Sequence, residues 1–299
     1  MIYVYKNIFI DAIVHVAFDP AEELVWSGSA GGRLASHWVS YADPSQDKDT
    51  APMLANPVLR LVTQVRAFKP GCPVRQVLPL NDAVLALGDS AVRVYSRGGL
   101  PLAYIPALED ASDLLCMDVV AQTQGLVCGG RNGVLTSIDL NTCQATHHHA
   151  FQDPNFLGVA SIKAASRYLA CAGIDGQVTL HDPRSLALAH TVQGHAGPVT
   201  DLDLRQHLLV TCGMNIFRGR AATEPAIKVF DLRRHISPLA QIPMFPGPVL
   251  LKYNPKFSLS LLTASDSGSF CMCDVGGCFI MPGSYQVPPQ PSFSLVYFR

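Results

Sequence analysis

Charged residues are scarce in this chain. Lysine, arginine, aspartate and glutamate make up only 15% of its 299 residues, and the formal net charge is −1. A protein that binds nucleic acid by neutralising phosphates needs a basic surface, so any contact with RNA has to be local. With 48% hydrophobic residues, a chain of this length can bury a large core in one domain.

Several other signals are missing. No apolar run reaches the length of a membrane span, and residues 1–19 lack the basic start, apolar block and small-residue cleavage site of a secretory signal. The chain shows no helical periodicity and no glycine-rich phosphate-binding loop that opens a helix. We therefore expect a soluble, intracellular protein built of strands, without a cofactor, a membrane partner or a small-molecule substrate.

The nine cysteines are an odd number without regular spacing, and those inside predicted strands behave as small hydrophobic residues. Two groups are the candidate metal ligands. Zinc needs four ligands in loop geometry, and neighbouring side chains of a strand point to opposite faces. We therefore predict strand packing for the cysteines, a surface turn or strand end for the histidines, and no metal site. The two groups are Cys271, Cys273 and Cys278, and His147, His148 and His149.

The stretch Gly194–Arg233 has the layout of one WD40 repeat. A Gly-His pair is followed by two short apolar runs, VTDLDL and LLVTCG, and Asp231 comes 36 residues after His195. This order is typical of a loop and three antiparallel strands of a propeller blade. The residue that ends the third strand recurs at steps of 43, 43, 49 and 43 residues, a period that belongs to blade arrays. These residues are Ser96, Asp139, Asp182, Asp231 and Asp274.

Six blades are recognisable, so we predict an all-β WD40 β-propeller over residues 1–285. Residues 286–299 are a Pro-rich tail or the start of a last, truncated blade. Because exposed sheet edges are a liability, we expect the two ends of the chain to contribute strands to a seventh, closing blade. The six blades begin near Ile13, Cys72, Leu114, Gly158, Gly194 and Gly247.

Repeat architecture explains the residues that a search for catalytic triads would select. We predict that His195 hydrogen-bonds to the hydroxyl of Thr211 within its blade, and that Asp231 ends the third strand. The aspartate usual in the turn is missing, because an insertion at Met214–Pro225 replaces it. We therefore assign no catalytic residue. Other inner turns carry aspartates that have a structural reason to occur there, namely Asp89, Asp175 and Asp266.

The insertion is the best candidate for a contact surface. It reads NIFRGRAATEP and places an aromatic residue and two arginines, Phe217, Arg218 and Arg220, on a predicted loop. Functional residues favour loops on rigid scaffolds, and this combination suits a protein contact or a stacked RNA base. A mobile polar loop without a function is the alternative.

The motifs, taken in order, resemble a known family. They are FDPAEELVWSGSAGGRLASHW, SRGGLP, GHAGPVTDLDLRQHLLVTCG, AIKVFDLR, GPVLLKYNPK and TASDSGSF. Together they resemble the N-terminal WD40 domain of the catalytic, poly(A)-nuclease subunit of the Pan deadenylase complex, over roughly residues 13 to 275. The most specific element is LVTCG followed by an inserted loop and IKVFDLR.

The resemblance implies a modular enzyme in which the propeller precedes a linker, an inactive ubiquitin-hydrolase-like domain and an exonuclease. In that family the propeller helps join a pseudokinase-like regulatory subunit and recognise the poly(A) ribonucleoprotein. No counterpart of the family's catalytic carboxylates can be assigned before Arg299. We therefore expect a non-catalytic scaffold for poly(A)-tail shortening in the cytoplasm, P-bodies included. The alternatives are a generic WD40 adaptor of another pathway and an enzyme that acts in the propeller funnel.

Overall fold

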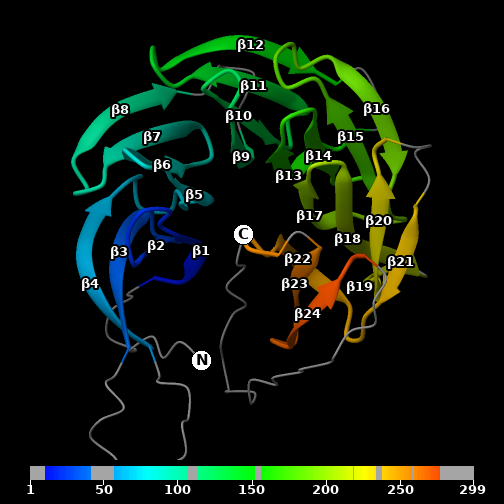
Figure 1. The fold of residues 1–299 in the computed structure, drawn as a ribbon. Coiled ribbons are helices and arrows are strands. Elements are labelled where there is room, and N and C mark those ends of the chain that lie inside the picture. The colour runs from blue at the N-terminus through cyan, green and yellow to red at the C-terminus, as the bar shows by residue number, and fades with distance from the viewer. Residues whose placement is uncertain are drawn as a thin grey trace, which may run out of the picture. The chain divides into compact units, whose positions relative to one another are not determined.

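The computed structural model describes residues 11–41, 57–106, 113–151, 156–217, 219–233, 238–257 and 259–276. Across these ranges the chain forms strands and connecting turns, and no helix occurs in them. The strands make six antiparallel sheets (Figure 1). By its contacts the chain divides into two compact units, one reaching to Pro106 and one following it.

The first unit contains two four-stranded sheets, in which strands that are neighbours in sequence are also neighbours in space. Its core lies between the two sheets and includes Trp26, Leu34, Val77 and Tyr95. The strands are β1 (Ile13–Phe18), β2 (Leu24–Ser29), β3 (Arg33–Tyr41), β4 (Pro57–Arg66), β5 (Gln76–Pro79), β6 (Ala83–Leu87), β7 (Ala91–Ser96) and β8 (Pro101–Pro106).

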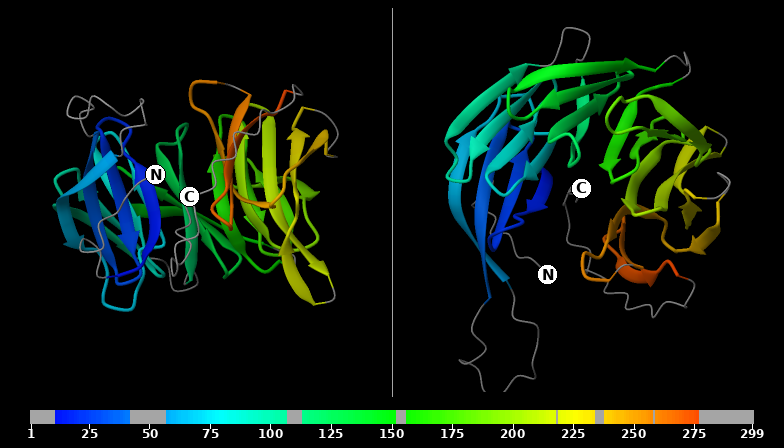
Figure 2. Two further views of the ribbon diagram at one scale, coloured as in Figure 1. Left: turned by 90° about the horizontal axis from the view of Figure 1, so that it is seen from below. Right: turned by 45° about the horizontal axis from the view of Figure 1, so that its top comes forward.

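The second unit contains the next two four-stranded sheets, which begin where the third and fourth blades are predicted, near Leu114 and Gly158. The first strands of successive sheets, β9, β13, β17 and β22, are packed next to one another (Figure 2). The strands of these two sheets are β9 (Leu114–Val120), β10 (Gly125–Gly130), β11 (Val134–Asp139), β12 (Gln144–Ala150), β13 (Val159–Ala164), β14 (Leu169–Gly173), β15 (Gln177–His181) and β16 (Leu188–Gln193).

The last two sheets of the second unit correspond to the predicted fifth and sixth blades. Three strands of the sixth are described. Cys278, the tail at 286–299 and the two chain ends expected to close a seventh blade lie outside the described residues. The strands are β17 (Val199–Arg205), β18 (Leu208–Phe217), β19 (Arg220–Thr223), β20 (Ala226–Asp231), β21 (Ala240–Pro243), β22 (Pro248–Tyr253), β23 (Ser260–Ser265) and β24 (Phe270–Asp274).

Small residues in β10 and β14 let neighbouring sheets of the second unit approach closely. β10 reads GLVCGG and β14 reads LACAG, and every residue of both strands is buried. A Cβ atom at Gly129 would lie only 3.1 Å from the side chain of Ile162 in the adjacent sheet. The apolar runs of these strands therefore supply the core between sheets, as a stacked β architecture requires.

Candidate interaction site

The insertion in the fifth sheet is a hairpin, where we expected a loop. β18 continues past the sheet and pairs with β19, from Met214 opposite Thr223 to Phe217 opposite Arg220. Gly219 has a φ of +73°, which suits the two-residue connection of a hairpin. The expectation of a loop was wrong because β-branched and aromatic residues within the polar segment extend the strand.

The base of this hairpin is fixed by a polar network around His195. Nε2 of His195 lies 2.9 Å from Oγ1 of Thr211, and Nδ1 lies 2.5 Å from Oε2 of Glu224. Nζ of Lys228 lies 3.0 Å from the other carboxylate oxygen of Glu224 and donates to the carbonyl of Gly194. Glu224 therefore takes the place of the turn aspartate that the sequence appeared to lack.

Burial decides the protonation of this network. Desolvation lowers the pKa of His195 and outweighs the hydrogen bond to Glu224, which favours the charged ring. The pKa of Glu224 is lowered, because hydrogen bonds from His195 and Lys228 outweigh the effect of its own burial. A carboxylate only accepts, so the neutral ring donates from Nδ1 and its Nε2 accepts the proton of the Thr211 hydroxyl. The network is complete without a substrate.

The other site residues predicted in this sheet lie at the end of its third strand and on the hairpin. Asp231 ends β20, and its carboxylate accepts from Nε and Nη2 of Arg233 at 3.0 and 2.8 Å. These bonds from Arg233 hold the pKa of Asp231 well below its usual range. Arg220 is exposed on β19. Phe217 ends β18, but its side chain lies outside the described residues, as does Arg218.

Aspartates on the first strands join successive sheets of the second unit. Oδ2 of Asp118 accepts from the backbone N of Ala164 at 2.8 Å, and Oδ2 of Asp203 accepts from that of Tyr253 at 2.7 Å. Oδ1 of Asp203 also accepts from its neighbour Leu204 at 2.9 Å. Sequence analysis missed these residues, since a single aspartate in an apolar strand does not reveal a partner some 50 residues away.

Two lysines, Lys163 and Lys252, interact electrostatically with these aspartates. Burial alone would lower the pKa of Lys163, but the carboxylates of Asp118 and Asp203 raise it. Burial, followed by the charge of Lys163, lowers the pKa of Lys252. The carboxylates are already bonded to backbone N–H groups, so we interpret the cluster as part of the scaffold.

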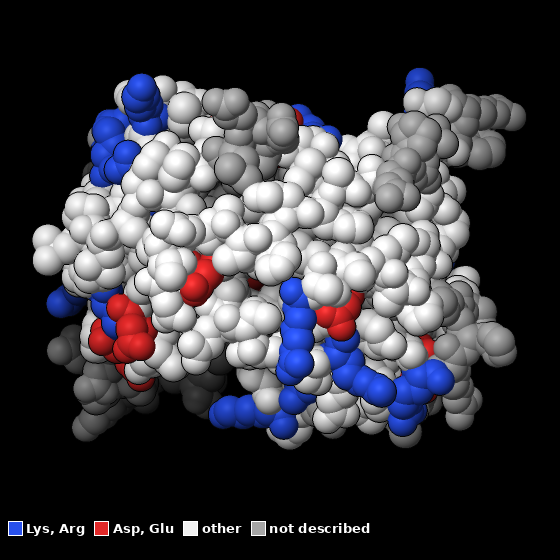
Figure 3. Space-filling view, turned by 90° about the horizontal axis from the view of Figure 1, so that it is seen from above, with Lys and Arg blue, Asp and Glu red and all other residues white. Residues whose placement is uncertain are grey.

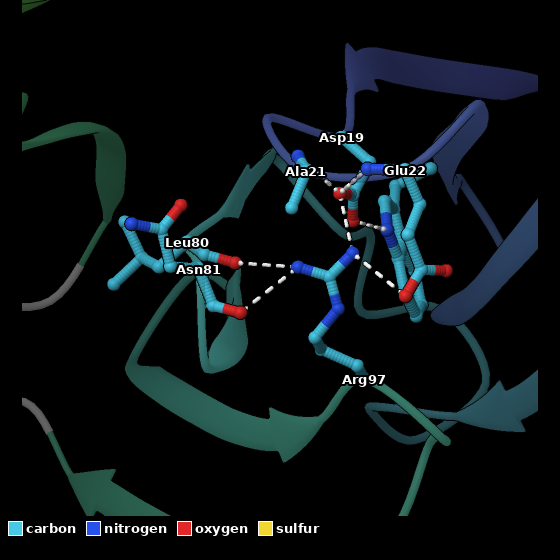
Figure 4. Close-up of polar contacts among 7 residues, drawn as sticks. Asp19, Ala21, Glu22, Leu80, Asn81 and Arg97 are labelled. Atoms are coloured by element: carbon cyan, nitrogen blue, oxygen red, sulfur yellow. Dashed lines mark hydrogen bonds and ion pairs between the residues drawn. The ribbon is translucent and has the colours of Figure 1, made fainter.

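A comparable bridge ties the two sheets of the first unit together. Nη2 of Arg97 donates to Oδ1 of Asp19 at 2.5 Å, and Nη1 donates to the carbonyl of Asn81 at 2.9 Å (Figure 4). Asp19 also accepts from Nε1 of the buried Trp26 at 3.0 Å. Its pKa is lowered because these donors and the backbone N–H groups of its turn outweigh desolvation. The bridge is internal and holds the loop after β1 against the turn after β7.

The other candidate ligands of the sequence are held by local contacts. Among the described residues no group of three or more His, Cys, Asp or Glu could hold a metal ion. Nδ1 of His148 lies 3.3 Å from Oγ1 of Thr136, and the ring of His149 packs edge-on against the ring of His181.

The cysteines and the turn aspartates also have local contacts. Sγ of Cys271 lies 3.1 Å from the hydroxyl oxygen of Thr263, and Cys273 is buried. Asp89 pairs with Arg75, Asp175 accepts from the backbone N of Gln177, and Asp266 is exposed.

Two further surface properties bear on partners. Figure 3 shows Lys and Arg side chains on several parts of the face drawn there, with Asp and Glu side chains beside some of them. None of the chain segments that the structure describes is a helix long and apolar enough to cross a membrane.

Comparison with known proteins identifies the family of the chain. It matches the family model "PAN2 N-terminal" over residues 7–296. It is 29% identical over 262 residues to the PAN2-PAN3 deadenylation complex catalytic subunit pan2 of Schizosaccharomyces pombe, covering 87% of the chain and 22% of that protein. It is 30% identical over 262 residues to the corresponding subunit of Mus musculus, covering 87% and 20%. The chain thus spans about a fifth of the length of these relatives.

Solved structures show the fold. The Pan2 WD40 domain of Neurospora crassa superimposes with a TM-score of 0.74 and 24% identity, covering 89% of this chain and 76% of that one. A computationally designed protein, Ika8, gives a TM-score of 0.67 and 16% identity, covering 92% and 76%. The six sheets are therefore those of a WD40 β-propeller, as the repeat period predicts. Within that class, the chain belongs to the PAN2 N-terminal family.

Proposed function

We propose that this chain is a non-catalytic propeller scaffold of a Pan deadenylation complex, acting in subunit assembly and in recognition of the poly(A) ribonucleoprotein. The observation that carries the proposal is the family match over residues 7–296. The relatives are catalytic subunits of complexes named PAN2-PAN3, and the chain covers only 20% to 22% of their length. The partner we expect is the pseudokinase-like regulatory subunit, PAN3, and the location is the cytoplasm, P-bodies included.

The physical character of the chain supports a scaffold. Buried aspartates join successive sheets of the second unit, and the hairpin at Met214–Thr223 extends from one of these sheets. Functional contacts favour such projections from rigid frames. The net charge of −1 favours contact with proteins over contact with bare phosphates.

Binding to PAN3 tests the proposal. We expect the purified chain to bind PAN3 of the same organism in calorimetry, and poly(A) ribonucleoprotein in an anisotropy titration. If the hairpin contacts one of these partners, the double variant Arg218→Glu, Arg220→Glu should weaken the affinity for PAN3 or for the poly(A) ribonucleoprotein about tenfold. The exposed pair Arg167 and Arg184, changed to glutamate, is the matched control.

Three results would contradict parts of this account. Unchanged affinities in the hairpin variant would remove the hairpin from it. Failure of the wild-type chain to bind either partner would leave the alternative, a generic WD40 adaptor of another pathway. Shortening of a poly(A) oligonucleotide by the chain with Mg²⁺ would contradict a non-catalytic role.

A further inference from the structure

Charged residues occupy the same position in four successive first strands of the second unit. Each of β9, β13, β17 and β22 has a bulge, and the third residue to pair with the second strand after that bulge is charged. These first strands pack against one another in this order. The register therefore aligns residues of alternating charge across the four sheets. They are Asp118, Lys163, Asp203 and Lys252.

The two lysines of this series differ in their neighbours. Lys163 on β13 has a strand with carboxylates on each side, β9 and β17, and its Nζ lies 4.0 Å from Oδ2 of Asp118. Lys252 on β22 is the last of the series and has such a strand, β17, on one side. Lys163 is therefore the lysine that keeps its proton more firmly.

The backbone on both sides of Lys252 is fixed, whereas the residue itself is exposed. The N–H of Leu251 donates to Oδ2 of Asp201 at 3.0 Å, and that of Tyr253 donates to Oδ2 of Asp203 at 2.7 Å. These bonds hold the base of the lysine side chain at the end of the charged series. The amine is thus held in place and open to a reagent in solution.

The amines of the two lysines lie within hydrogen-bonding reach of each other. Two ammonium groups carry donors only, so a hydrogen bond between them requires that one amine is neutral. Desolvation, followed by the charge of Lys163, lowers the pKa of Lys252, and the carboxylates of Asp203 and Asp201 oppose this shift without outweighing it. Lys252 is therefore the amine that is neutral more often, and a neutral amine is a nucleophile.

We propose that Nζ of Lys252 is a modification site that takes an acyl group from an acyl thioester. The lone pair of the amine attacks the thioester carbonyl, and the C–N bond forms as the C–S bond breaks. The leaving thiolate takes up the proton that the nitrogen releases. The inference goes beyond the proposed scaffold function and does not rest on it.

The surroundings of Lys252 favour acyl transfer over other modifications of lysine. Methylation keeps a positive charge beside Lys163, and so does the protonated imine that an aldehyde forms. Carbon dioxide would give a carbamate, whose negative charge would lie beside Asp203. An amide is neutral, so it ends the repulsion between the two lysines, and its carbonyl oxygen can accept a hydrogen bond from Lys163.

Competitive labelling of the folded chain tests the proposal. The chain is incubated with N,S-diacetylcysteamine, an uncharged acetyl thioester, and acetylation of each lysine is followed by peptide mass spectrometry. The reference is Lys256, an exposed lysine shortly after β22. A larger neutral fraction speeds the reaction of Lys252 and a less basic amine is a weaker nucleophile, so we expect Lys252 to react about threefold faster than Lys256 at pH 7.

The pH dependence separates this chemistry from simple accessibility. The advantage of Lys252 comes from its larger neutral fraction, so the ratio of the two rates should fall between pH 7 and pH 10 as Lys256 also loses its proton. Unfolding the chain in urea should remove the difference between the two lysines. A ratio that is the same at both pH values would indicate exposure alone and overturn the proposal.

Substitutions of Lys163 test the cause of the reactivity. Lys163→Met removes the neighbouring charge at similar length and should slow the acetylation of Lys252 about threefold at pH 7. Lys163→Arg keeps that charge and should stay within about twofold of wild type. Arg167→Met removes an exposed charge elsewhere in the same unit and is the matched control, with an unchanged rate expected.

Two further results would contradict the site. Equal rates for Lys252 and Lys256 in the folded wild-type chain at pH 7 would overturn it, whether or not the variants fold. An unchanged Lys252 rate in Lys163→Met, with circular dichroism of the folded protein, would do the same. Binding to PAN3 is a separate measurement, so the modification site and the scaffold function can fail independently.

Discussion

At the scale of single residues, burial keeps histidines of this chain neutral. His181 is fully buried, with Nδ1 2.9 Å from the carbonyl of Leu186 and Nε2 3.0 Å from the hydroxyl of Thr179. Desolvation lowers its pKa to about 4, and His149, which packs against it, adds to the shift. His195 is shifted in the same direction. Folding therefore depends on two rings that resist protonation.

This shift predicts a loss of stability in acid. The unfolded chain protonates His181 below about pH 6.5 while the folded chain does not until about pH 4, so stability falls across this interval. From His181 alone we expect the free energy of unfolding to drop by about 2 kcal/mol between pH 7.5 and pH 5. Urea titrations at the two pH values measure it.

The variant His181→Asn is the control for this prediction. Its amide replaces the donor to Leu186 but does not titrate. The variant should be less stable at pH 7.5 and should lose about 2 kcal/mol less than wild type on acidification. An identical pH dependence in the two proteins would show that His181 is not the group responsible.

The polar network at His195 shows what residue-level sequence reasoning reaches. Repeat spacing pointed to Thr211, which lies within hydrogen-bonding distance of the ring. Repeat spacing did not predict Glu224 as a partner of His195, because the inserted hairpin moves Glu224 away from the usual position of the turn aspartate. Its position directly before Pro225 and the third strand was the available signal.

At the scale of strands and sheets, aspartates in the first strands hold successive sheets together. Asp203 is buried and accepts from the N–H groups of Leu204 and Tyr253. We expect Asp203→Ala to lower the free energy of unfolding by about 2–4 kcal/mol, because two buried donors lose their acceptor. Chemical denaturation followed by tryptophan fluorescence and circular dichroism measures the change.

Asp182 is the matched control. It also accepts from two backbone N–H groups, those of Arg184 and Ser185 at 2.9 Å, but on an exposed turn where water can replace it. Asp182→Ala should therefore cost less than about 1 kcal/mol. Equal losses in the two variants would mean that the bridge between sheets contributes little.

The strands themselves could be predicted more fully than their contacts. The blade starts predicted near Leu114 and Gly158 coincide with the starts of β9 and β13, because alternation and turn residues are local signals. The prediction of a loop at Met214–Thr223 was wrong, because the polar composition of this hairpin hides its strand propensity. Asp118 and Asp203 bridge sheets across long sequence separations, which no local pattern encodes.

At the scale of the whole molecule, a period of 43 residues was enough to identify the propeller. Each blade is one supersecondary unit that needs its neighbours to bury its faces, so the repeat alone implies the architecture. Family membership rests instead on the order of specific motifs, confirmed by the match over residues 7–296.

The balance of charge over the molecule predicts how it meets RNA. Each phosphate neutralised on a single strand contributes a slope of about −0.7 to the dependence of log affinity on log salt. With a net charge of −1, the chain should neutralise few phosphates. We expect weak binding to an adenosine oligonucleotide of about 20 residues, with a slope smaller in magnitude than about 2.

Anisotropy titrations at several salt concentrations measure this slope. A slope of about −5 would require about seven phosphate contacts and an extended basic track. Recognition of a poly(A) ribonucleoprotein would then run through RNA, whereas a shallow slope points to its protein components.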